Sequence, residues 1–180
     1  METRSGTVFW LTGLSGSGKT TLGKALTNAL KCQGHPVIFF DGDQLREITG
    51  HLFGHEQEER LQASLVYARL CHTLAAQSFH VVCATISLFH ETQRWNRHHI
   101  PNYIEIFLDI PLSHLIERDS KKIYMRAQKG QLSNVVGIDI VPEFPQKPDI
   151  AINNPHLSIQ EAVDQIIALF HEKFLVHDEI

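Results

Sequence analysis

Near its amino terminus the chain reads Gly13-Leu14-Ser15-Gly16-Ser17-Gly18-Lys19-Thr20. The octapeptide has the spacing G-x-x-x-x-G-K-S/T of a phosphate-binding P-loop, and the apolar run 8–11 leads directly into it. In such a loop the glycines let backbone N–H groups turn toward phosphate oxygens, and the start of the following helix adds a favourable dipole. The motif therefore predicts a nucleoside triphosphate site between a strand and a helix.

The polar side chains of this loop predict how the nucleotide is bound. Lys19 is expected to reach the β- and γ-phosphates, and the hydroxyl of Thr20 to contact Mg²⁺. No Asn-Lys-x-Asp run of the kind that recognises guanine occurs in the sequence, which disfavours a guanine-nucleotide switch and favours a small-molecule kinase. The predicted nucleotide-binding residues of the loop are Gly13, Ser15, Gly16, Ser17, Gly18, Lys19, Thr20 and Thr21.

Length, composition and charge limit the classes of protein to consider. The chain has 180 residues, 43% of them apolar, which is enough for one domain over 1–180 with a sizeable core. Its net charge of −4 predicts no basic face for a nucleic acid, and no apolar run is long enough to cross a membrane. The first six residues lack the apolar segment of a signal peptide, and the three cysteines form no C-x-x-C pair, so a cytoplasmic protein is expected.

Strand-like and helical patterns alternate along the chain. Strands are expected at 7–11, 37–40, 81–84, 103–108 and 149–152. Helices are expected over 19–32, 56–77 and 111–118, and a capping box at 158–161 opens a last helix that runs to about residue 176. The alternation predicts a three-layer α/β fold of the P-loop NTPase type, with about five parallel strands and helices on both faces. Residues 121–147 carry glycines, prolines and charges, and are expected to form a mobile lid.

Two carboxylates follow the second predicted strand, in the run Asp41-Gly42-Asp43. The carboxyl edge of an open α/β sheet is where ligands bind, so both side chains are expected near the P-loop. There they would suit contacts to Mg²⁺-bound water and acceptance of a hydroxyl proton. A structural alternative is that Asp43 caps the helix that follows, and both can hold together.

Cations and histidines are further candidates for functional roles. The cations Arg118, Lys121 and Lys122 follow the fourth predicted strand and its helix, where they would neutralise a transferring phosphoryl group or flank the nucleotide. A solvated run of charges is the alternative. The twelve histidines show no spacing with Cys or Asp that is typical of a metal site, and most of them are expected at the surface.

Through most of its length the chain resembles the adenylylsulfate (APS) kinase family. Beyond the P-loop, the similarity includes an Asp-Gly-Asp-x-x-Arg segment, an Arg-Asp-x-Lys-x-x-Tyr segment and a Gly-Ile-Asp segment at the end of the lid. The matching segments, in order, are 13–22, 41–46, 86–87, 107–112, 118–124, 137–139 and 148–150. The resemblance implies a kinase that uses MgATP to phosphorylate the ribose 3′-hydroxyl of APS, giving PAPS, and that forms a homodimer.

The resemblance also implies roles for the matching residues. Lys19, Asp41 and Asp43 are implied to be catalytic, with Asp43 also holding Mg²⁺ through water. Arg118 is implied to flank the base of ATP, and Lys121 to approach the phosphates as the lid closes. The residues implied to bind the acceptor are Asp43, Arg46, His55, Arg60, Ile86, Ser87, Val135 and Ile138.

The sequence departs from the family pattern on the acceptor side. The family's Phe-Ser-x-x-Asp-Arg and Glu-Asn-Ile-Arg-Arg segments correspond to the stretch 55–66, which keeps Arg60 but lacks the Asn and both later arginines. An aromatic–base–aromatic sandwich becomes at most a one-sided stack, because His55 and Val135 replace the two phenylalanines. Charge-assisted contacts to the acceptor's anionic groups are also lost.

Two acceptors are therefore predicted for one reaction. The leading one is the 3′-hydroxyl of APS, which would place the enzyme in sulfate assimilation. The alternative is another nucleotide-linked molecule, such as cytidine diphosphoramidate in surface-polysaccharide biosynthesis. A non-catalytic nucleotide-sensing module is disfavoured by the two carboxylates Asp41 and Asp43, and a nucleic-acid end kinase by the acidic net charge.

Overall fold

The strands form one parallel sheet whose carboxyl ends lie at a single edge. The computed structural model describes residues 5–119, 122–154 and 156–174. In these residues the strand order is β2-β3-β1-β4-β5, and every neighbouring pair is parallel. The α/β fold is thereby confirmed, and every strand boundary lies within two residues of its predicted place. The strands are β1 (Val8–Gly13), β2 (Val37–Asp41), β3 (His80–Ala84), β4 (Tyr103–Leu108) and β5 (Ile150–Ile152).

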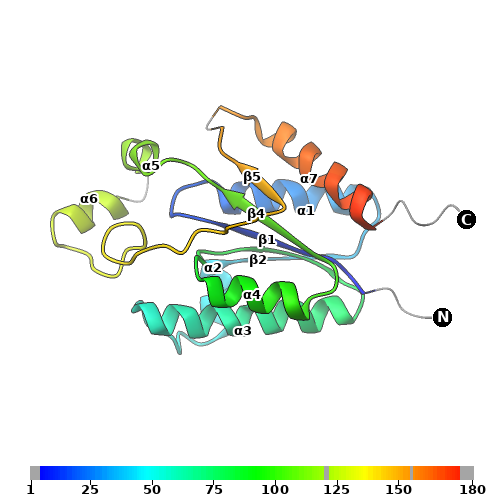
Figure 1. Cartoon of the computed structure of the whole chain (residues 1–180), viewed down its shortest axis with the longest axis horizontal. Helices are drawn as coiled ribbons and strands as arrows, with labels where there is room; N and C mark the ends of the chain where they lie inside the picture. Colours follow the sequence, from blue (N-terminus) through cyan, green and yellow to red (C-terminus); the bar gives the residue numbers. More distant parts are fainter. Residues whose placement is uncertain (1–4, 120–121, 155, 175–180) are drawn as a thin grey trace, which may run out of the picture.

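Helices cover both faces of the sheet, as predicted. Helices α1 and α7 pack on one face and α3 and α4 on the other, while α5 and α6 lie beyond the carboxyl edge (Figure 1). No helix in the described part of the chain combines the length and apolar character needed to span a bilayer. The helices are α1 (Lys19–Cys32), α2 (Gly42–Ile48), α3 (Gln57–Ala76), α4 (His90–His99), α5 (Leu112–Arg118), α6 (Ile123–Gln128) and α7 (Ile159–Phe174).

Strand β1 is the centre of the hydrophobic core, because every one of its residues is buried. Phe9 and Leu11 face the layer that contains α1 and α7, whereas Val8 and Trp10 face the layer that contains α3. Successive side chains of a strand point to opposite faces, so a strand apolar at each position needs cover on both. The apolar run before the P-loop thus fixes both helical layers.

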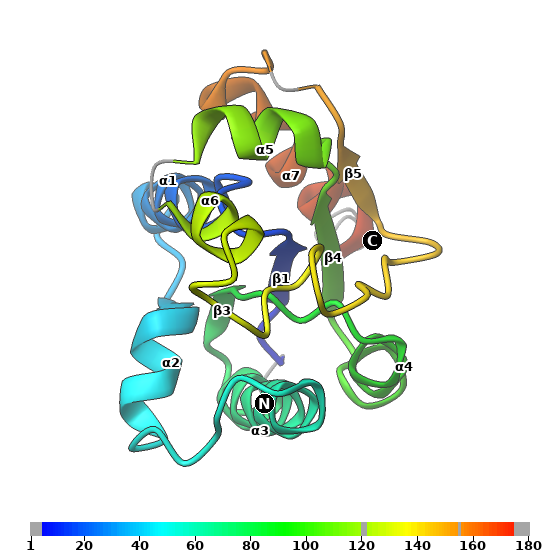
Figure 2. The same cartoon turned by 90° about the vertical axis from the view of Figure 1, so that its left-hand side faces the viewer.

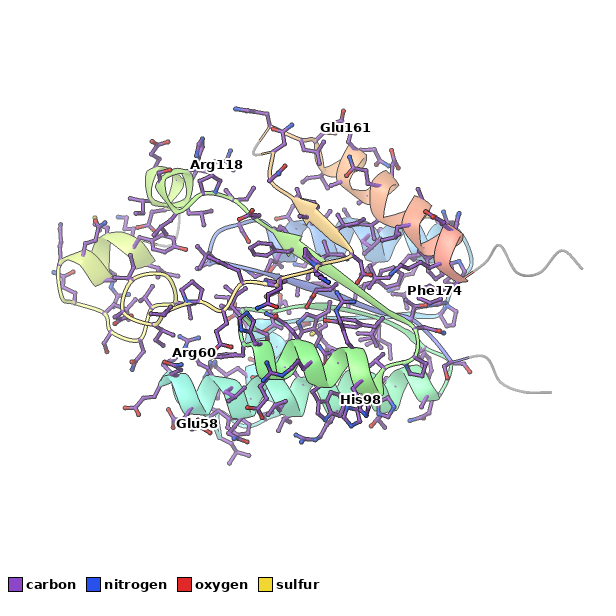
Figure 3. The ribbon with its side chains drawn as sticks, in the orientation of Figure 1. Glu58, Arg60, His98, Arg118, Glu161 and Phe174 are labelled. Atoms are coloured by element: carbon purple, nitrogen blue, oxygen red, sulfur yellow. The ribbon has the colours of Figure 1, made fainter. Side chains whose placement is uncertain are left out.

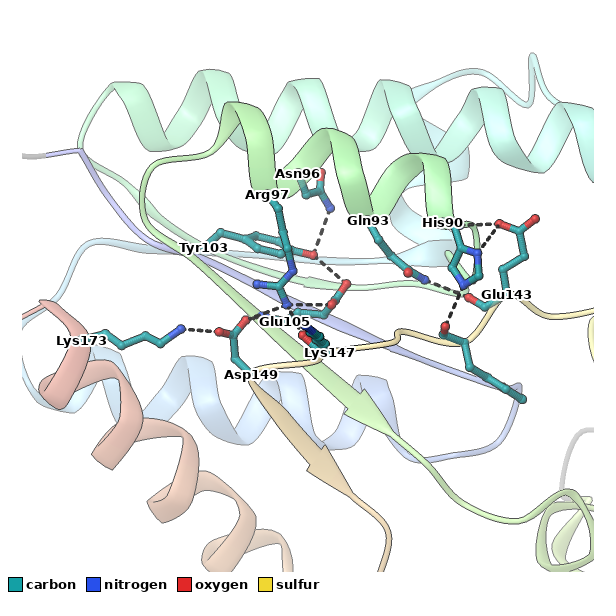
Figure 4. A network of polar contacts seen from close by, with 11 residues as sticks. His90, Gln93, Asn96, Arg97, Tyr103, Glu105, Glu143, Lys147, Asp149 and Lys173 are labelled. Atoms are coloured by element: carbon teal, nitrogen blue, oxygen red, sulfur yellow. Dashed lines mark hydrogen bonds and ion pairs between the residues drawn. The ribbon is translucent and has the colours of Figure 1, made fainter.

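Helix α4 was not predicted, because the face that it buries is polar. Asn96 Nδ2 donates to the hydroxyl of Tyr103 at 3.2 Å, and Arg97 Nη2 lies 2.9 Å from Glu105 and 3.1 Å from Asp149 (Figure 4). Glu105 lies on the inner strand β4 and is only 1% exposed, so its charge depends on Arg97. An apolar repeat of helical period cannot reveal such a helix. Its buried residues are Thr92, Gln93 and Asn96.

The capping box predicted for the last helix is confirmed. Ser158 Oγ donates to Glu161 Oε2 at 2.7 Å, and the Glu161 backbone N–H donates back to Ser158 Oγ at 3.2 Å. The described helix ends at Phe174, and its predicted end near residue 176 lies outside the described residues.

His80 is an exception to the expectation that most histidines lie at the surface. Its Nδ1 accepts a hydrogen bond from the Thr7 backbone N–H at 3.0 Å, and its ring packs against His35 and Phe170 at 4.9 and 5.3 Å. Burial, and secondarily the charge of His35, lowers the pKa of His80 from 6.5 to about 4. The folded chain therefore keeps His80 neutral.

We predict that His80 makes the folded state less stable in acid. Because its folded pKa is below its unfolded pKa, its contribution is complete above pH 6.5 and is lost as the pH falls toward 4, by about 1–3 kcal/mol. In H80N the amide oxygen can still accept from Thr7, so the wild type should lose more free energy of unfolding than H80N between pH 7 and 4.5. Urea unfolding at both pH values measures this. The control is H98N on the exposed end of α4, and an equal pH loss in the wild type and H80N would contradict the assignment.

Candidate active site

The P-loop joins the end of β1 to the start of α1 in a tight turn that only glycine can make at two positions. Gly13 has φ +148°, and a Cβ atom there would lie 2.7 Å from the Leu108 carbonyl oxygen of β4. Gly18 is the N-cap of α1 and has the left-handed φ of +96°. The loop therefore passes close against the neighbouring strand, and its amides surround the start of α1.

Lys19 is the buried cation of the loop. It is only 8% exposed, and its Nζ donates to the Leu14 carbonyl oxygen at 2.7 Å and approaches Ser17 Oγ at 3.4 Å. The side chain thus lies along the inner side of the loop, while Thr20 and Thr21 are exposed at the first turn of α1. This arrangement keeps an ammonium group beside the backbone of the loop that the motif predicts to bind phosphate.

A cavity of about 270 Å³ lies between the P-loop and the carboxyl ends of β2 and β3. It brings together most of the residues predicted to bind ATP and both predicted catalytic carboxylates. Gly13 and Ser17 of the predicted set are not among its lining residues. The lining residues are Ser15, Gly16, Gly18, Lys19, Thr20, Thr21, Asp41, Gly42, Asp43, Ala84, Thr85 and Ile86.

Asp41, and not Asp43, caps the helix that follows the second strand, so the alternative considered for Asp43 was wrong. Asp41 Oδ1 accepts from the backbone N–H groups of Asp43 at 3.2 Å and Gln44 at 3.0 Å. Gln44 Oε1 accepts from the Asp41 N–H at 3.3 Å, which completes a capping box. Capping of α2 thus occupies one oxygen of Asp41, and Asp43 lies exposed in the first turn of that helix.

A second cavity of about 180 Å³ adjoins the first. Ser15 and Ile86 line both cavities, so the two share a wall at the P-loop. Of the residues predicted to bind the acceptor, the structure gathers His55, Arg60, Ile86 and Val135 here. The full lining is Ser15, His55, Arg60, Ile86, Ile123, Leu132, Ser133, Asn134, Val135 and Val136.

Other predicted acceptor residues lie outside this lining. Arg46 donates to the carbonyl oxygen of Phe53 at 2.7 Å, so it holds the loop before α3. Ser87 is fully buried under the site. Ile138 is 39% exposed and lines neither cavity.

The two cations assigned to the ATP side are not in either cavity lining. Arg118 is exposed at the end of α5, apart from Arg60 (Figure 3). Lys121 lies outside the described residues.

Tyr124 connects the lid to the P-loop, a contact that the sequence did not predict. Its hydroxyl donates to the Ser15 carbonyl oxygen at 2.8 Å, and the side chain is 1% exposed. Burial, with a smaller effect of the Asp119 charge, raises the pKa of Tyr124 to about 12, so the hydroxyl stays a donor. Asp119 starts helix α6 by accepting from the backbone N–H groups of Ile123 and Met125, each at 2.8 Å. The Arg-Asp-x-Lys-x-x-Tyr segment was the signal available in the sequence.

The lid runs across the carboxyl edge of the sheet and returns along α4. In Figure 2, which faces this edge, α6 and the loop after it pass in front of β1 and β3. On the return path, Glu143 Oε2 accepts from the His90 backbone N–H at 2.5 Å, and Gln93 Nε2 donates to the Glu143 carbonyl oxygen at 2.9 Å (Figure 4). Polar contacts thus hold both ends of the lid.

Comparison with known proteins decides the family. A sequence model described as adenylylsulphate kinase matches residues 5–153. The chain belongs to this family. A cytidine diphosphoramidate kinase of Campylobacter jejuni subsp. jejuni serotype O:2 is 40% identical over 161 residues, which cover 89% of this chain and 94% of the relative. An adenylyl-sulfate kinase of Chloroflexus aurantiacus is 36% identical over 166 residues, covering 92% and 89%.

Solved structures of the family have the same fold. The structure of the Mycobacterium tuberculosis APS kinase CysC in complex with AMPPNP and APS superposes with a TM-score of 0.87 at 29% identity, covering 93% of this chain and 98% of that one. The shikimate kinase of Aquifex aeolicus shares the fold at 19% identity and a TM-score of 0.59. This family member is thus a phosphotransferase that acts on a hydroxyl group.

We predict that Y124F loosens the lid from the P-loop. Removing the hydroxyl leaves the Ser15 carbonyl without its donor, which should lower the free energy of unfolding by about 1–2 kcal/mol. The KM for ATP should rise, because Ser15 belongs to the phosphate-binding loop. Thermal melting measures the change in stability, and steady-state kinetics measure the KM for ATP. The matched control is Y67F in α3, since the hydroxyl of Tyr67 makes no hydrogen bond within the described part of the chain; equal effects of both variants would contradict the role of Tyr124.

Proposed function

We propose that this kinase transfers the γ-phosphoryl group of MgATP to a hydroxyl of a nucleotide-linked molecule held in the second cavity. The observation that carries the proposal is the shared wall of the two cavities at Ser15 and Ile86. A triphosphate on the P-loop amides and an acceptor beside His55 and Arg60 would meet at this wall. Proximity of this kind converts a bimolecular reaction into a step within one complex.

The cavity beside the P-loop has donors that suit Mg²⁺. The hydroxyl of Thr20 and the carboxylates of Asp41 and Asp43 line it, and hydroxyl, carboxylate and phosphate oxygens are the ligands that Mg²⁺ prefers. In our proposal Thr20 holds the ion directly and Asp43 through water. When bound, Mg²⁺ neutralises charge on the phosphates of ATP.

Protein side chains supply the remaining parts of the proposed reaction. Lys19 places its ammonium group against the β- and γ-phosphates and stabilises the charge that develops during transfer. Asp43, which is exposed to the cavity, accepts the proton of the attacking hydroxyl. Asp41 assists by holding the first turn of α2, on which Asp43 lies. The lid excludes water from the transferring group, which suppresses hydrolysis of ATP.

For the acceptor we propose a cytidine diphosphate conjugate, with APS as the second candidate. His55 is the one aromatic-type ring among the lining residues of the second cavity, and Val135, which corresponds by resemblance to the second stacking phenylalanine, also lines it. Loss of one stacking face weakens binding of a base by about 1–3 kcal/mol. The relative that is 40% identical acts, by its name, on cytidine diphosphoramidate. APS is supported by the adenylyl-sulfate kinases among the relatives, at 37% identity and below.

We predict that ADP release depends on a cytidine-linked acceptor. The assay offers MgATP with cytidine diphosphoramidate, other cytidine diphosphate conjugates, APS, free nucleosides, or no acceptor, and product masses identify the phosphorylated species. Saturable turnover with cytidine diphosphoramidate and at least tenfold lower kcat/KM with APS is the expected result. Saturable turnover with APS and none with the cytidine conjugates would make the enzyme an APS kinase.

We predict that the two carboxylates separate into a chemical and a capping role. Asn caps a helix about as well as Asp, so D41N should keep most activity and stability, whereas D41A should lose about 0.5–2 kcal/mol of stability. D43N should lower kcat roughly 10²–10⁴-fold with an unchanged melting temperature. Full activity of D43N would rule out Asp43 as the base.

We predict that K19A lowers kcat roughly 10²–10³-fold, because the ammonium group that stabilises the transferring phosphoryl group is lost. The exposed Lys24 of the same helix supplies the control K24A.

Location and assembly are also part of the proposal. We propose a cytoplasmic homodimer. Ile48 and Leu52, which are 60% and 80% exposed on α2 and the loop after it, offer apolar surface that a second copy would cover. Light scattering of the purified protein, and of the variant L52E, measures the assembly.

A further inference from the structure

The guanidinium of Arg60 is engaged with protein groups on two sides of the second cavity. Its Nε donates to the His55 carbonyl oxygen at 2.7 Å, and its Nη2 donates to the Asn134 carbonyl oxygen at 2.9 Å. The same Nη2 lies 3.3 Å from His55 Nδ1. Two of the three guanidinium nitrogens therefore face the loop before α3 and the lid. Arg60 and Asn134 are 74 positions apart in the chain, so this contact joins two separate walls of the cavity.

The lid segment that Arg60 reaches is itself a fixed turn. Asp139 accepts from the Asn134 backbone N–H at 2.6 Å and from the Val135 N–H. Asn134 has a φ of +62°, a left-handed conformation that asparagine adopts more readily than most residues other than glycine. The negative charge of Asp139 also acts on Arg60, where it raises a guanidinium pKa that burial and Arg46 lower. Arg60, Asn134 and Asp139 thus form one connected polar unit at the tip of the lid.

The contact with Arg60 also sets the state of the His55 ring. Arg60 Nη2 is a donor only, so Nδ1 of His55 is the acceptor and the proton of the neutral ring lies on Nε2. Burial, followed by the charges of Arg46 and Arg60, lowers the pKa of His55, which keeps the ring neutral. His55 therefore presents a neutral ring with a single N–H donor to the cavity that it lines.

We infer that Arg60 is a positioning residue, which holds His55 and the lid at Asn134 in a fixed relation around the acceptor instead of neutralising the acceptor's charge. The inference rests on the proposed function, because it takes the second cavity as the acceptor site. It reassigns a residue that sequence resemblance places among direct contacts to the acceptor. In this inference the first turn of α3, where Arg60 lies, holds the lid in its closed position through the hydrogen bond to Asn134.

Two substitutions of Arg60 distinguish a positioning role, through hydrogen bonds to His55 and Asn134, from a direct charge contact to the acceptor. Lysine keeps the positive charge of Arg60 but cannot donate simultaneously from a planar fork to His55 and Asn134, whereas alanine removes both properties. The positioning hydrogen bonds are lost in R60K and R60A alike. A charge that pairs with the acceptor's phosphates is retained in R60K and lost in R60A. The matched control is R69A, an exposed arginine farther along α3 that stacks on Trp95 at 5.5 Å.

The first readout needs no substrate. Amide hydrogen exchange of Asn134 and Val135 in the free protein should become roughly tenfold faster in both R60K and R60A, because the lid loses its contact with α3, and should be unchanged in R69A. Exchange at wild-type rates in R60A would overturn the inference. Because this measurement uses no acceptor, it tests the role of Arg60 separately from the proposed function. The proposed function would instead fail if the wild type showed no turnover.

The second readout is kinetic. For every acceptor that the wild type uses, R60K and R60A should lower kcat by a similar factor of about ten and raise acceptor-independent hydrolysis of ATP, because water enters where the lid is no longer held at Asn134. Restoration of wild-type kinetics in R60K, together with a rise confined to the acceptor KM in R60A, would assign Arg60 a direct contact and overturn the inference. Melting temperatures of all variants establish that each is folded.

Discussion

The parallel pairing of β1 with β3 on one side and β4 on the other is the constraint on which the rest of the molecule depends. Because these strands run in the same direction, all of their carboxyl ends reach one edge. Gly13 at the end of β1 therefore lies beside Leu108 at the end of β4, and β2 delivers Asp41 to the same edge. This register therefore places the phosphate loop and the two carboxylates at the same edge of the sheet, beside the proposed acceptor cavity.

The lid is held by apolar packing as well as by hydrogen bonds. Four of its side chains are buried in one apolar cluster with Leu14 of the P-loop, namely Tyr124, Val135, Val136 and Ile140. The hydrogen bonds of Tyr124, Arg60 and Glu143 add polar contacts to this packing. Because a single hydrogen bond contributes a net of only about 0.5–1.5 kcal/mol, the buried cluster is a substantial part of what fixes the described lid.

The two halves of the site differ in how strongly the chemistry constrains them. In the proposed function, triphosphate binding relies on backbone amides, two glycine conformations and Lys19, and a side chain at Gly13 would collide with β4. The proposed acceptor site relies on side chains that line a cavity, and these can change without disturbing the sheet. The retained P-loop and the altered positions His55 and Val135 are consistent with this difference. A family of one fold can therefore phosphorylate different nucleotide conjugates.

The local pattern of the sequence was sufficient for the five strands, the helices α1, α3, α5 and α7, and the phosphate loop. Apolar alternation and glycine spacing are properties of adjacent residues, and the structure confirms what they predict. The pairing of Asp41 and Asp43 with the P-loop in one cavity was also predicted, from the rule that the carboxyl ends of parallel strands meet.

Contacts between residues far apart in the chain decided the features that local patterns did not predict. Helix α4 buries polar groups against Glu105 and Tyr103, and so has no apolar repeat; α6 is short and is started by the side chain of Asp119. His80 is half-buried because the residue before the first strand, Thr7, and the last helix meet there. The engagement of Arg60 with Asn134 spans 74 positions, which no local pattern encodes. The sequence by itself determined the sheet and the phosphate-loop motif, since both follow from local backbone preferences and the order of neighbouring residues. Only the tertiary structure decided that Arg60 meets Asn134 and that Tyr124 meets Ser15, since these pairings join segments that are far apart in the chain.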